Sequence, residues 1–426
     1  MSSHQHINAR QISSETFKNE EPPAKRRQLS SCDDGESQHL RRLPLRAAVV
    51  EEGQSPSTTD ELTVQSGKSL TGEEITCNNN NNNNIEAVDF SVVSADGTDD
   101  RTSKDYYFDS YAHHAIHEEM LKDEVRTKTY EMAIMQNKYL FQDKIILDVG
   151  CGTGILSMFA AQAGAKHVYA VDCSSIADQA RQIVELNGFS DKITVIKGKI
   201  EEIDLPVAEV DVIVSEWMGY FLLYESMLDS IIFARDKWLV KENGIVFPDK
   251  AVMYVCAAED GDVKRDRVDF WSNVYGFDMS PIRNIALKEP VVDVIDGKSI
   301  VTDATPILHL DILTCKKEDV EFEASFELKA LRNDYVHGLV AYFECAFTQV
   351  HKPIGFSTSP FCRYTHWKQT IFYLPESLVT CTGETIAGEI KCKPNKKNRR
   401  DLDISITLSV NGRHSKFTKQ MNYRLR

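Results

Sequence analysis

The sequence lacks the long apolar runs and the surplus of basic residues that mark two large classes of protein. No run of about 18 apolar residues occurs, and the first thirty residues contain no continuous apolar stretch, so neither a membrane-spanning helix nor a secretory signal is indicated. A net charge of −15 argues against a broad basic surface that binds nucleic acid through its phosphates. We therefore expect an intracellular protein of nucleus and cytoplasm, without direct contact to nucleic acid or membranes.

Paired cysteines are lacking as well. The ten cysteines form neither a C-x-x-C pair nor a cluster with histidine, which is typical of reduced thiols rather than of a disulfide framework or a zinc site. His113, His114 and His117 lie near one another, but no other group of ligand-type residues accompanies them. We therefore predict no metal.

Aromatic residues are scarce in the first quarter of the chain. Residues 1–104 contain only Phe17 and Phe90, are rich in small polar and charged residues, and include an unbroken asparagine run at 78–84. This composition cannot bury enough apolar surface to offset the entropy of ordering, so we predict a disordered, low-complexity tail. The basic cluster at 25–27 is better interpreted as a solvated charge run than as a nuclear import signal.

Residues 105–250 have the pattern of an α/β domain. Apolar positions between Tyr106 and Asn137 recur at helical spacing and predict N-terminal helices. Beyond them, apolar strand-like runs alternate with helical stretches, at 144–150, 154–163, 167–172, 176–187, 193–198 and 211–216. This alternation predicts a parallel sheet with helices on both faces.

Residues 251–426 show a different period. Apolar residues alternate strictly with polar ones over 402–410 and 322–328, which predicts antiparallel strands with one solvent-facing side, arranged as a β-barrel or sandwich. One stretch interrupts this pattern, because Val268, Trp271, Val274 and Tyr275 have helical spacing before a turn at Gly276. We expect an inserted helical arm at about 259–289.

A glycine-rich loop follows the first predicted strand. Gly150, Gly152 and Gly154 stand between an apolar strand and a helical stretch, and Asp172 ends the next strand 22 residues after Gly150. This spacing places a carboxylate beside the ribose hydroxyls of a nucleoside at the carboxyl ends of the strands. Strand, loop, helix and distal acid together indicate a nucleoside cofactor rather than a tight turn alone.

Two cofactors compete for this loop. The dinucleotide fingerprint is G-x-G-x-x-G, whereas here the third glycine comes one residue earlier, at Gly154. S-adenosylmethionine has no phosphates and needs no phosphate-binding loop, so the sequence favours it. Glu201 follows the third predicted strand and is expected to reach the adenine edge, although an isolated residue of this kind is more often a surface carboxylate.

Two glutamates border an apolar loop after the fourth predicted strand. Glu216 ends the strand, and Gly219 permits a reversal that brings Glu225 back towards it. Such a pair matches the rigid fork of a guanidinium, which binds carboxylates in a bidentate manner. Two other interpretations stay open: Glu225 near a helix start also suits the helix dipole, and Glu216 is also placed to contact the cofactor.

From Tyr106 to Arg426 the sequence resembles the type I protein arginine methyltransferases. The shared motifs are Tyr107–Tyr111, Asp123–Thr127, the glycine loop, Ser215–Tyr220 with Tyr224–Met227, and Thr365–Trp367. The resemblance implies a Rossmann-like S-adenosylmethionine-dependent methyltransferase domain, a substrate-binding β-barrel and a dimerisation arm. It further implies asymmetric dimethylarginine as product, Gly/Arg-rich proteins and histones as substrates, and a homodimer or higher oligomer.

The resemblance also assigns roles to individual residues. It gives cofactor binding to His117, Arg126, Gly150, Gly152, Asp172 and Glu201, with Arg126 pairing with the cofactor carboxylate. It gives substrate binding and catalysis to Glu216, Glu225, Tyr111, Asp123 and His366, the last two as a pair that orients the site or passes on a proton. It gives product specificity to Met120 and Met227, which by themselves would be ordinary core residues.

Three positions depart from the family. Members usually have Ser at the position of Cys151, Glu at that of Asp172 and an aromatic residue at that of His114. None of these removes a catalytic group, though Asp172 is one methylene shorter. A nicotinamide-dependent oxidoreductase is the alternative enzyme, disfavoured by the glycine spacing, and a catalytically silent scaffold is the alternative from another class, disfavoured by the presence of both Glu216 and Glu225.

Overall fold

The computed structural model describes residues 111–426. The predicted tail at 1–104, the start of folded structure at 105 and most of the Tyr107–Tyr111 motif lie outside these residues. Among the described helices, none is both long and apolar enough to cross a membrane.

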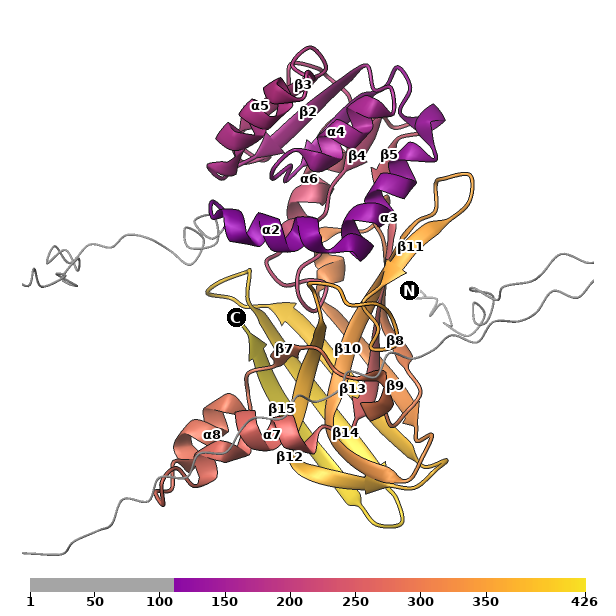
Figure 1. Ribbon diagram of the computed structural model, residues 1–426. Helices are drawn as coiled ribbons and strands as arrows, with labels where there is room; N and C mark the ends of the chain where they lie inside the picture. The colour runs from indigo at the N-terminus through magenta and orange to yellow at the C-terminus, as the bar shows by residue number, and fades with distance from the viewer. Residues whose placement is uncertain (1–110) are drawn as a thin grey trace, which may run out of the picture. The chain divides into compact units, whose positions relative to one another are not determined.

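A parallel five-stranded sheet with the order β3-β2-β1-β4-β5 forms the first part of the described chain (Figure 1). Strands β1, β2 and β4 are mostly buried, apolar runs, as central parallel strands covered on both faces require, whereas the edge strand β3 alternates between buried and exposed positions. The strands are β1 (Ile145–Val149), β2 (His167–Asp172), β3 (Ile193–Lys197), β4 (Val212–Val214) and β5 (Ile245–Phe247). The predicted parallel sheet is confirmed.

Helices precede and connect these strands. They are α2 (His114–Lys122), α3 (Glu124–Met135), the short 3₁₀ helix η1 (Lys138–Leu140), α4 (Ile155–Gln162), α5 (Ile176–Leu186) and α6 (Met227–Trp238). Helices α4 and α5 pack on the sheet, and α3 packs on α4. Asp123 separates α2 from α3 and caps α3, because its Oδ1 accepts a hydrogen bond from the Arg126 N–H at 3.0 Å.

The strand order reverses at β1, which lies between β2 and β4. In open parallel sheets, ligands bind outside the carboxyl ends of the strands at such a reversal. The glycine loop follows β1 and Glu216 follows β4, so the fold brings the two main sequence motifs to the same crevice.

Two antiparallel sheets form the β-barrel of the C-terminal part. One contains β6 (Lys250–Ala258), β7 (Val291–Asp293), β8 (Thr305–Asp311), β10 (Asp334–Phe347), β11 (Ile354–Ser357) and β12 (Gln369–Thr380), and the other contains β9 (Phe322–Lys329), β13 (Thr385–Pro394), β14 (Leu402–Asn411) and β15 (Lys416–Leu425). The alternation predicted for β14 is confirmed along the strand. In β9 only Phe326 and Leu328 are fully buried, whereas Phe322 and Ala324 are half-buried.

The segment between β6 and β7 is helical and projects from the barrel strands (Figure 1). It contains α7 (Gly261–Arg267), the 3₁₀ helix η2 (Asp269–Ser272) and α8 (Ser280–Ala286). The spacing of Val268, Trp271, Val274 and Tyr275 does not correspond to a single helix. Instead, Val274 pairs with Phe277 around a turn in which Tyr275 and Gly276 have positive φ.

One hydrophobic core continues from the parallel sheet into the barrel. Four buried aromatic rings contact one another in a row through this core, with edge-to-face geometry and centroids 5.0–5.5 Å apart. The order along the row is Tyr130, Phe347, Phe247 and Phe141. The Trp367 indole of the barrel also donates a 2.7 Å hydrogen bond to the Met218 carbonyl in the loop after β4. These contacts fix the barrel against the end of the sheet that carries the crevice.

Candidate active site

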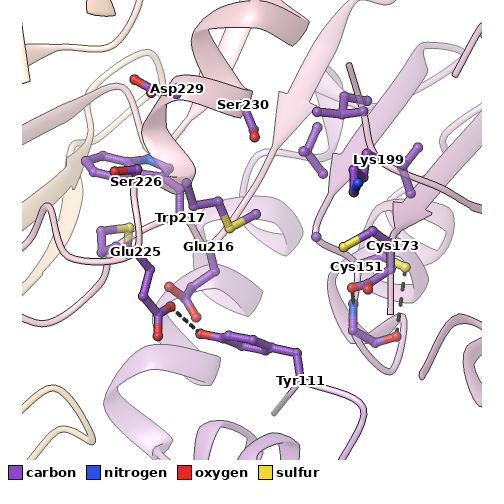
Figure 2. Close-up of a pocket in the computed structure, with 18 of the residues that line it drawn as sticks. Tyr111, Cys151, Cys173, Lys199, Glu216, Trp217, Glu225, Ser226, Asp229 and Ser230 are labelled. Carbon is purple, nitrogen blue, oxygen red and sulfur yellow. Dashed lines mark hydrogen bonds between the residues drawn. The ribbon is translucent and has the colours of Figure 1, made fainter. Parts of the chain in front are cut away.

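A cavity of about 640 Å³ opens at the carboxyl ends of β1, β2 and β4. Twelve of the thirteen predicted site residues line it: Tyr111, His117, Met120, Arg126, Gly150, Gly152, Asp172, Glu201, Glu216, Glu225, Met227 and His366. The thirteenth, Asp123, does not line the cavity but is hydrogen-bonded to the imidazole of His366. Figure 2 shows Tyr111, Glu216 and Glu225 at one end of this cavity and Cys151, Cys173 and Lys199 at the other.

The glycine loop lines the end of the cavity that contains Cys151 and Lys199. Gly150, Gly152 and Gly154 have φ values of 73°, 53° and 85°, in the left-handed region that favours glycine. A Cβ on Gly150 would come within 2.3 Å of the Met227 Cε, and one on Gly152 within 3.1 Å of the His117 Nδ1. The loop therefore presents bare backbone to the cavity, which suits close approach by a ligand.

Asp172 stands at the end of β2, as predicted, and its carboxylate organises the neighbouring backbone. Oδ2 accepts from the Gly152 N–H at 3.0 Å, and Oδ1 accepts from the Ser174 N–H and hydroxyl at 2.8 Å each. Glu201 lies at the same end and accepts a 2.6 Å hydrogen bond from the Ser230 hydroxyl. Both acids can accept further hydrogen bonds from hydroxyl or amine groups, because each carboxylate offers about four lone-pair sites.

Arg126 and Glu216 form a buried ion pair. The Arg126 Nε lies 2.9 Å from Glu216 Oε2, and both side chains are less than a tenth exposed. The family resemblance implied different partners for these two residues, a cofactor carboxylate for Arg126 and a substrate for Glu216. The pair uses only one of the five guanidinium donors and one carboxylate oxygen, so it leaves both groups able to bind a second partner.

Glu225 lies at the same end of the cavity, and its Oε2 accepts a 2.7 Å hydrogen bond from the Tyr111 hydroxyl (Figure 2). Burial and, to a smaller extent, the neighbouring Glu216 charge raise the pKa of Glu225 to about 7, against the opposing effects of Tyr111 and Arg400. Glu216 and Glu225 line the same end of the cavity, so the structure brings the predicted acid pair together (Figure 2). Their roles in binding a substrate stay predictions.

The loop that carries Glu225 is held in an uncommon backbone conformation. Phe221, Leu222, Glu225 and Ser226 all have positive φ values, between 50° and 75°. Left-handed backbone in non-glycine residues costs of the order of 1–3 kcal/mol per residue and clusters at functional sites. At Gly219 a side chain is sterically impossible, because a Cβ would lie 2.0 Å from the Tyr224 carbonyl oxygen.

His366 and Asp123 form a hydrogen-bonded pair beside this loop. Asp123 Oδ2 lies 2.7 Å from the His366 Nδ1 and accepts from the His366 N–H at 2.9 Å. Burial acts to raise the pKa of Asp123, but hydrogen bonds from His366 and Arg126 outweigh it and hold this pKa below its ordinary value. Asp123 is therefore ionised at neutral pH and fixes the orientation of the imidazole.

The two methionines lie at different edges of the cavity. Met227 begins α6 and packs on Gly150, and Met120 lies in α2, where its carbonyl oxygen accepts a 3.2 Å hydrogen bond from the Thr127 hydroxyl.

The histidines at 113, 114 and 117 do not converge on further ligands, and within residues 111–426 no group of three His, Cys, Asp or Glu side chains is arranged to hold a metal ion.

Sequence reasoning missed the loop between β13 and β14. Asn398 and Arg400 line the cavity, although they lie far along the chain from the other motifs. The only signal in the sequence is a basic, asparagine-containing turn between two alternating strands, which is typical of an ordinary hairpin connection.

Comparison with known proteins identifies the family. Residues 249–413 match the family model described as arginine methyltransferase oligomerization subdomain, and residues 127–231 match that of the ribosomal protein L11 methyltransferase. The chain is 56% identical to protein arginine N-methyltransferase 1.1 of Arabidopsis thaliana, over 86% of this chain and 93% of that one. The chain belongs to the protein arginine N-methyltransferase 1 family.

A second curated relative and a solved structure are similar over about three quarters of this chain. The Schizosaccharomyces pombe protein arginine N-methyltransferase 1 is 57% identical, over 76% of this chain and 96% of its own length. Among solved structures, the Trypanosoma brucei PRMT1 enzyme–prozyme heterotetrameric complex with AdoHcy shares 47% identity and a TM-score of 0.72, covering 74% of this chain and all of that one. The family relationship therefore covers both the parallel sheet and the barrel.

Proposed function

We propose that this chain is a type I protein arginine N-methyltransferase that transfers methyl groups from S-adenosylmethionine to a terminal guanidino nitrogen of arginine in proteins. The observation that carries the proposal is the meeting of Glu216 and Glu225 in one cavity with the glycine loop and Asp172. The cavity volume of about 640 Å³ is ample for a nucleoside cofactor together with one inserted side chain.

The cofactor end fits S-adenosylmethionine, which supplies an electrophilic methyl group on its sulfonium when bound. Bare backbone at Gly150 and Gly152 accommodates a closely apposed ligand, and the Asp172 carboxylate accepts from ribose hydroxyls. Glu201 accepts from the adenine amine. Arg126 pairs with the amino-acid carboxylate through donors that its ion pair with Glu216 leaves available.

At the other end, Glu216 and Glu225 hold the target guanidinium. A protonated guanidinium is a poor nucleophile, so the site has to concentrate lone-pair character on one nitrogen. Two carboxylates on one fork draw the positive charge towards the nitrogens they contact and leave the remaining nitrogen facing the glycine loop. Fixed orientation of this kind supplies on the order of 7–11 kcal/mol of a two-reactant barrier.

The proton released from the arginine has two acceptors within the site. The raised pKa of Glu225, about 7, suits it to take up a proton at neutral pH. His366, held by the ionised Asp123, is the second acceptor and lines the same cavity. Both routes keep the proton within hydrogen-bonded groups at the acid end.

We assign the asymmetric dimethylated form as the product. After the first transfer, the methylated nitrogen has to occupy the reactive position again, and Met120, Met227 and Tyr111 delimit the space available to it. The expected substrates are Gly/Arg-rich segments and histone tails, whose cationic character complements a chain of net charge −15.

Mass spectrometry of products tests this function. The purified chain is incubated with S-adenosylmethionine and either a Gly/Arg-rich peptide or histones, and fragmentation distinguishes the isomers by loss of dimethylamine or monomethylamine. We expect monomethylarginine first and asymmetric dimethylarginine later. Absence of methylation on both substrates would refute the activity, and predominantly symmetric product would refute the assigned specificity.

The same proposal includes a dimer formed through the helical arm. The oligomerization subdomain model covers this arm and the barrel strands up to β14. Five large apolar side chains of the arm are between 42% and 98% exposed: Phe270, Tyr275, Phe277, Ile282 and Ile285. We expect light scattering to give a dimer or a larger assembly for the wild type and a smaller species for a Tyr275→Ser, Phe277→Ser variant. An unchanged mass would contradict docking through the arm.

A further inference from the structure

The β13–β14 loop, residues 395–401, is hydrogen-bonded to two adjacent residues at the substrate end that have positive φ, Glu225 and Ser226. The Glu225 N–H donates to the Arg400 carbonyl at 3.0 Å, and the Ser226 hydroxyl donates to the Arg399 carbonyl at 2.6 Å. The Arg400 Nη1 donates in return to the Glu225 carbonyl at 2.5 Å. One barrel residue therefore holds the main chain of Glu225 from both sides.

Hydrogen bonds within the β13–β14 loop fix its own conformation. We call the hydrogen bonds between Arg400 and the Glu225 backbone the clamp. The buried Asn395 accepts from the N–H groups of Lys397 and Asn398 through its Oδ1, at 2.8 and 3.2 Å. Asn398 donates to the Asp401 carboxylate at 2.6 Å and accepts from the Arg400 N–H at 3.2 Å. Arg400 is thus placed by hydrogen bonds within its own loop, independently of Glu225.

Glu225 and Ser226 require such support. Their φ values of 75° and 57° lie in the left-handed region, and neither is glycine. Conformations of this kind persist only when the surrounding structure determines them. Without the clamp the chain would relax towards ordinary geometry, and the Glu225 carboxylate would leave the position in which it faces Glu216.

We infer that Arg400 is a positioning residue for the substrate-binding acid: its carbonyl and its guanidinium together fix the backbone of Glu225 from the barrel side. This inference rests on the proposed function. It also gives the barrel a direct part in the reaction centre, because β13 and β14 carry the loop that sets the geometry of Glu225.

The charge of Arg400 also acts on Glu225, together with other groups that raise or lower the pKa of this glutamate. The groups facing Glu225 are Tyr111, which donates to it, Glu216, whose charge raises the pKa of Glu225, the nearby Tyr220 and Tyr224, and Arg400, whose charge lowers this pKa. Removing the Arg400 charge should therefore raise the pKa of Glu225 above its value of about 7 and move the acidic limb of the activity profile to higher pH.

Two substitutions at one position separate the two effects. Arg400→Gln keeps a hydrogen-bond donor but loses the charge, whereas Arg400→Lys keeps the charge but loses the planar fork. Lys396→Ala is the matched control, because Lys396 is exposed in the same loop, lies outside the cavity lining and also carries one positive charge. For each chain, kcat and KM are measured on an arginine peptide from pH 6 to 9.5, together with the Kd for S-adenosylhomocysteine.

We expect Arg400→Gln to lower kcat/KM at pH 7 by roughly tenfold or more, mostly through kcat, with partial recovery at high pH, whereas Arg400→Lys lowers kcat without a shift in the profile. The Kd for S-adenosylhomocysteine and the behaviour of Lys396→Ala should match the wild type. An unshifted profile with kcat/KM equal to the control would overturn the inference, as would equal loss of cofactor affinity. A wild type that fails to methylate arginine would instead refute the proposed function.

Discussion

The two ends of the cavity are built in different ways. Most of the cofactor end consists of bare backbone at the glycine loop, the end of β2 and the Asp172 carboxylate, which residues 150–172 contribute and main-chain hydrogen bonds of the parallel sheet hold in place. Side chains from other segments, among them His117 and Glu201, complete it. The substrate end is assembled from side chains of the segment before α2, the start of α3, the loop after β4 and the barrel. Most of one end is local in sequence, whereas the other depends on tertiary structure throughout.

This difference separates the two tasks of a transferase. An end built from backbone can bind one invariant cofactor, because few side chains there can change its shape. An end built from side chains can tune charge and geometry, as the raised pKa of Glu225 and the buried Arg126–Glu216 pair illustrate. Substitutions at the two ends should therefore have different kinetic signatures.

Glu225→Gln should give the largest effect and confine it to the substrate end. The amide keeps the shape but cannot draw positive charge from a guanidinium, so we expect turnover to fall by at least about a hundredfold while the cofactor Kd stays within about twofold. Stopped-assay kinetics and calorimetry give the two values. Glu131→Gln, an exposed position on α3, is the control; near-normal turnover of Glu225→Gln would remove the proposed mechanism.

Gly150→Ala should give an intermediate effect at the cofactor end. The new methyl group would meet the Met227 Cε and push that flexible side chain into the cavity, so we expect the Kd for S-adenosylmethionine to rise by roughly ten- to a hundredfold. Gly188→Ala is a matched control, since Gly188 has the same φ of 73° but open space around its Cβ. Unchanged affinity in Gly150→Ala, or no recovery on adding Met227→Ala, would contradict this picture.

Lowering the pH should change the kcat/KM of the wild type less, near neutral pH, than either substitution does. Glu225 has a raised pKa of about 7, and its ionised form is the one that binds a guanidinium, so kcat/KM should decline as the pH falls through 7. We expect a limiting slope of about tenfold per pH unit at saturating cofactor. A profile that stays flat down to pH 5.5 would show that Glu225 does not titrate in this range.

The contrast between the ends also explains how far the sequence could predict the site. Strand β2 runs from His167 to Asp172 as predicted, because parallel strands leave continuous apolar runs, and the glycine loop has a fixed spacing to the distal acid. The acid pair was predictable as a juxtaposition, since Gly219 marks the reversal between Glu216 and Glu225. These signals are all local.

Other features depend on partners that are distant in the sequence. The Arg126–Glu216 pair joins residues 90 positions apart, and the bond from Arg400 to Glu225 spans 175 positions. Periodicity does not indicate which side chains meet across such separations, and only the family resemblance paired Asp123 with His366, which lie 243 positions apart. The arm tip was misjudged for a related reason, because the helical spacing of Val268 to Tyr275 arises from a 3₁₀ turn and a tight reversal rather than from one helix.

The most direct test of the two-ended cavity is a crystal structure of the chain with S-adenosylhomocysteine and an arginine peptide. We predict the adenosine beside Asp172 and Glu201, and the target guanidinium between the carboxylates of Glu216 and Glu225, with its free nitrogen towards the glycine loop. A guanidinium bound elsewhere, with either glutamate still engaged only by protein groups, would contradict the account.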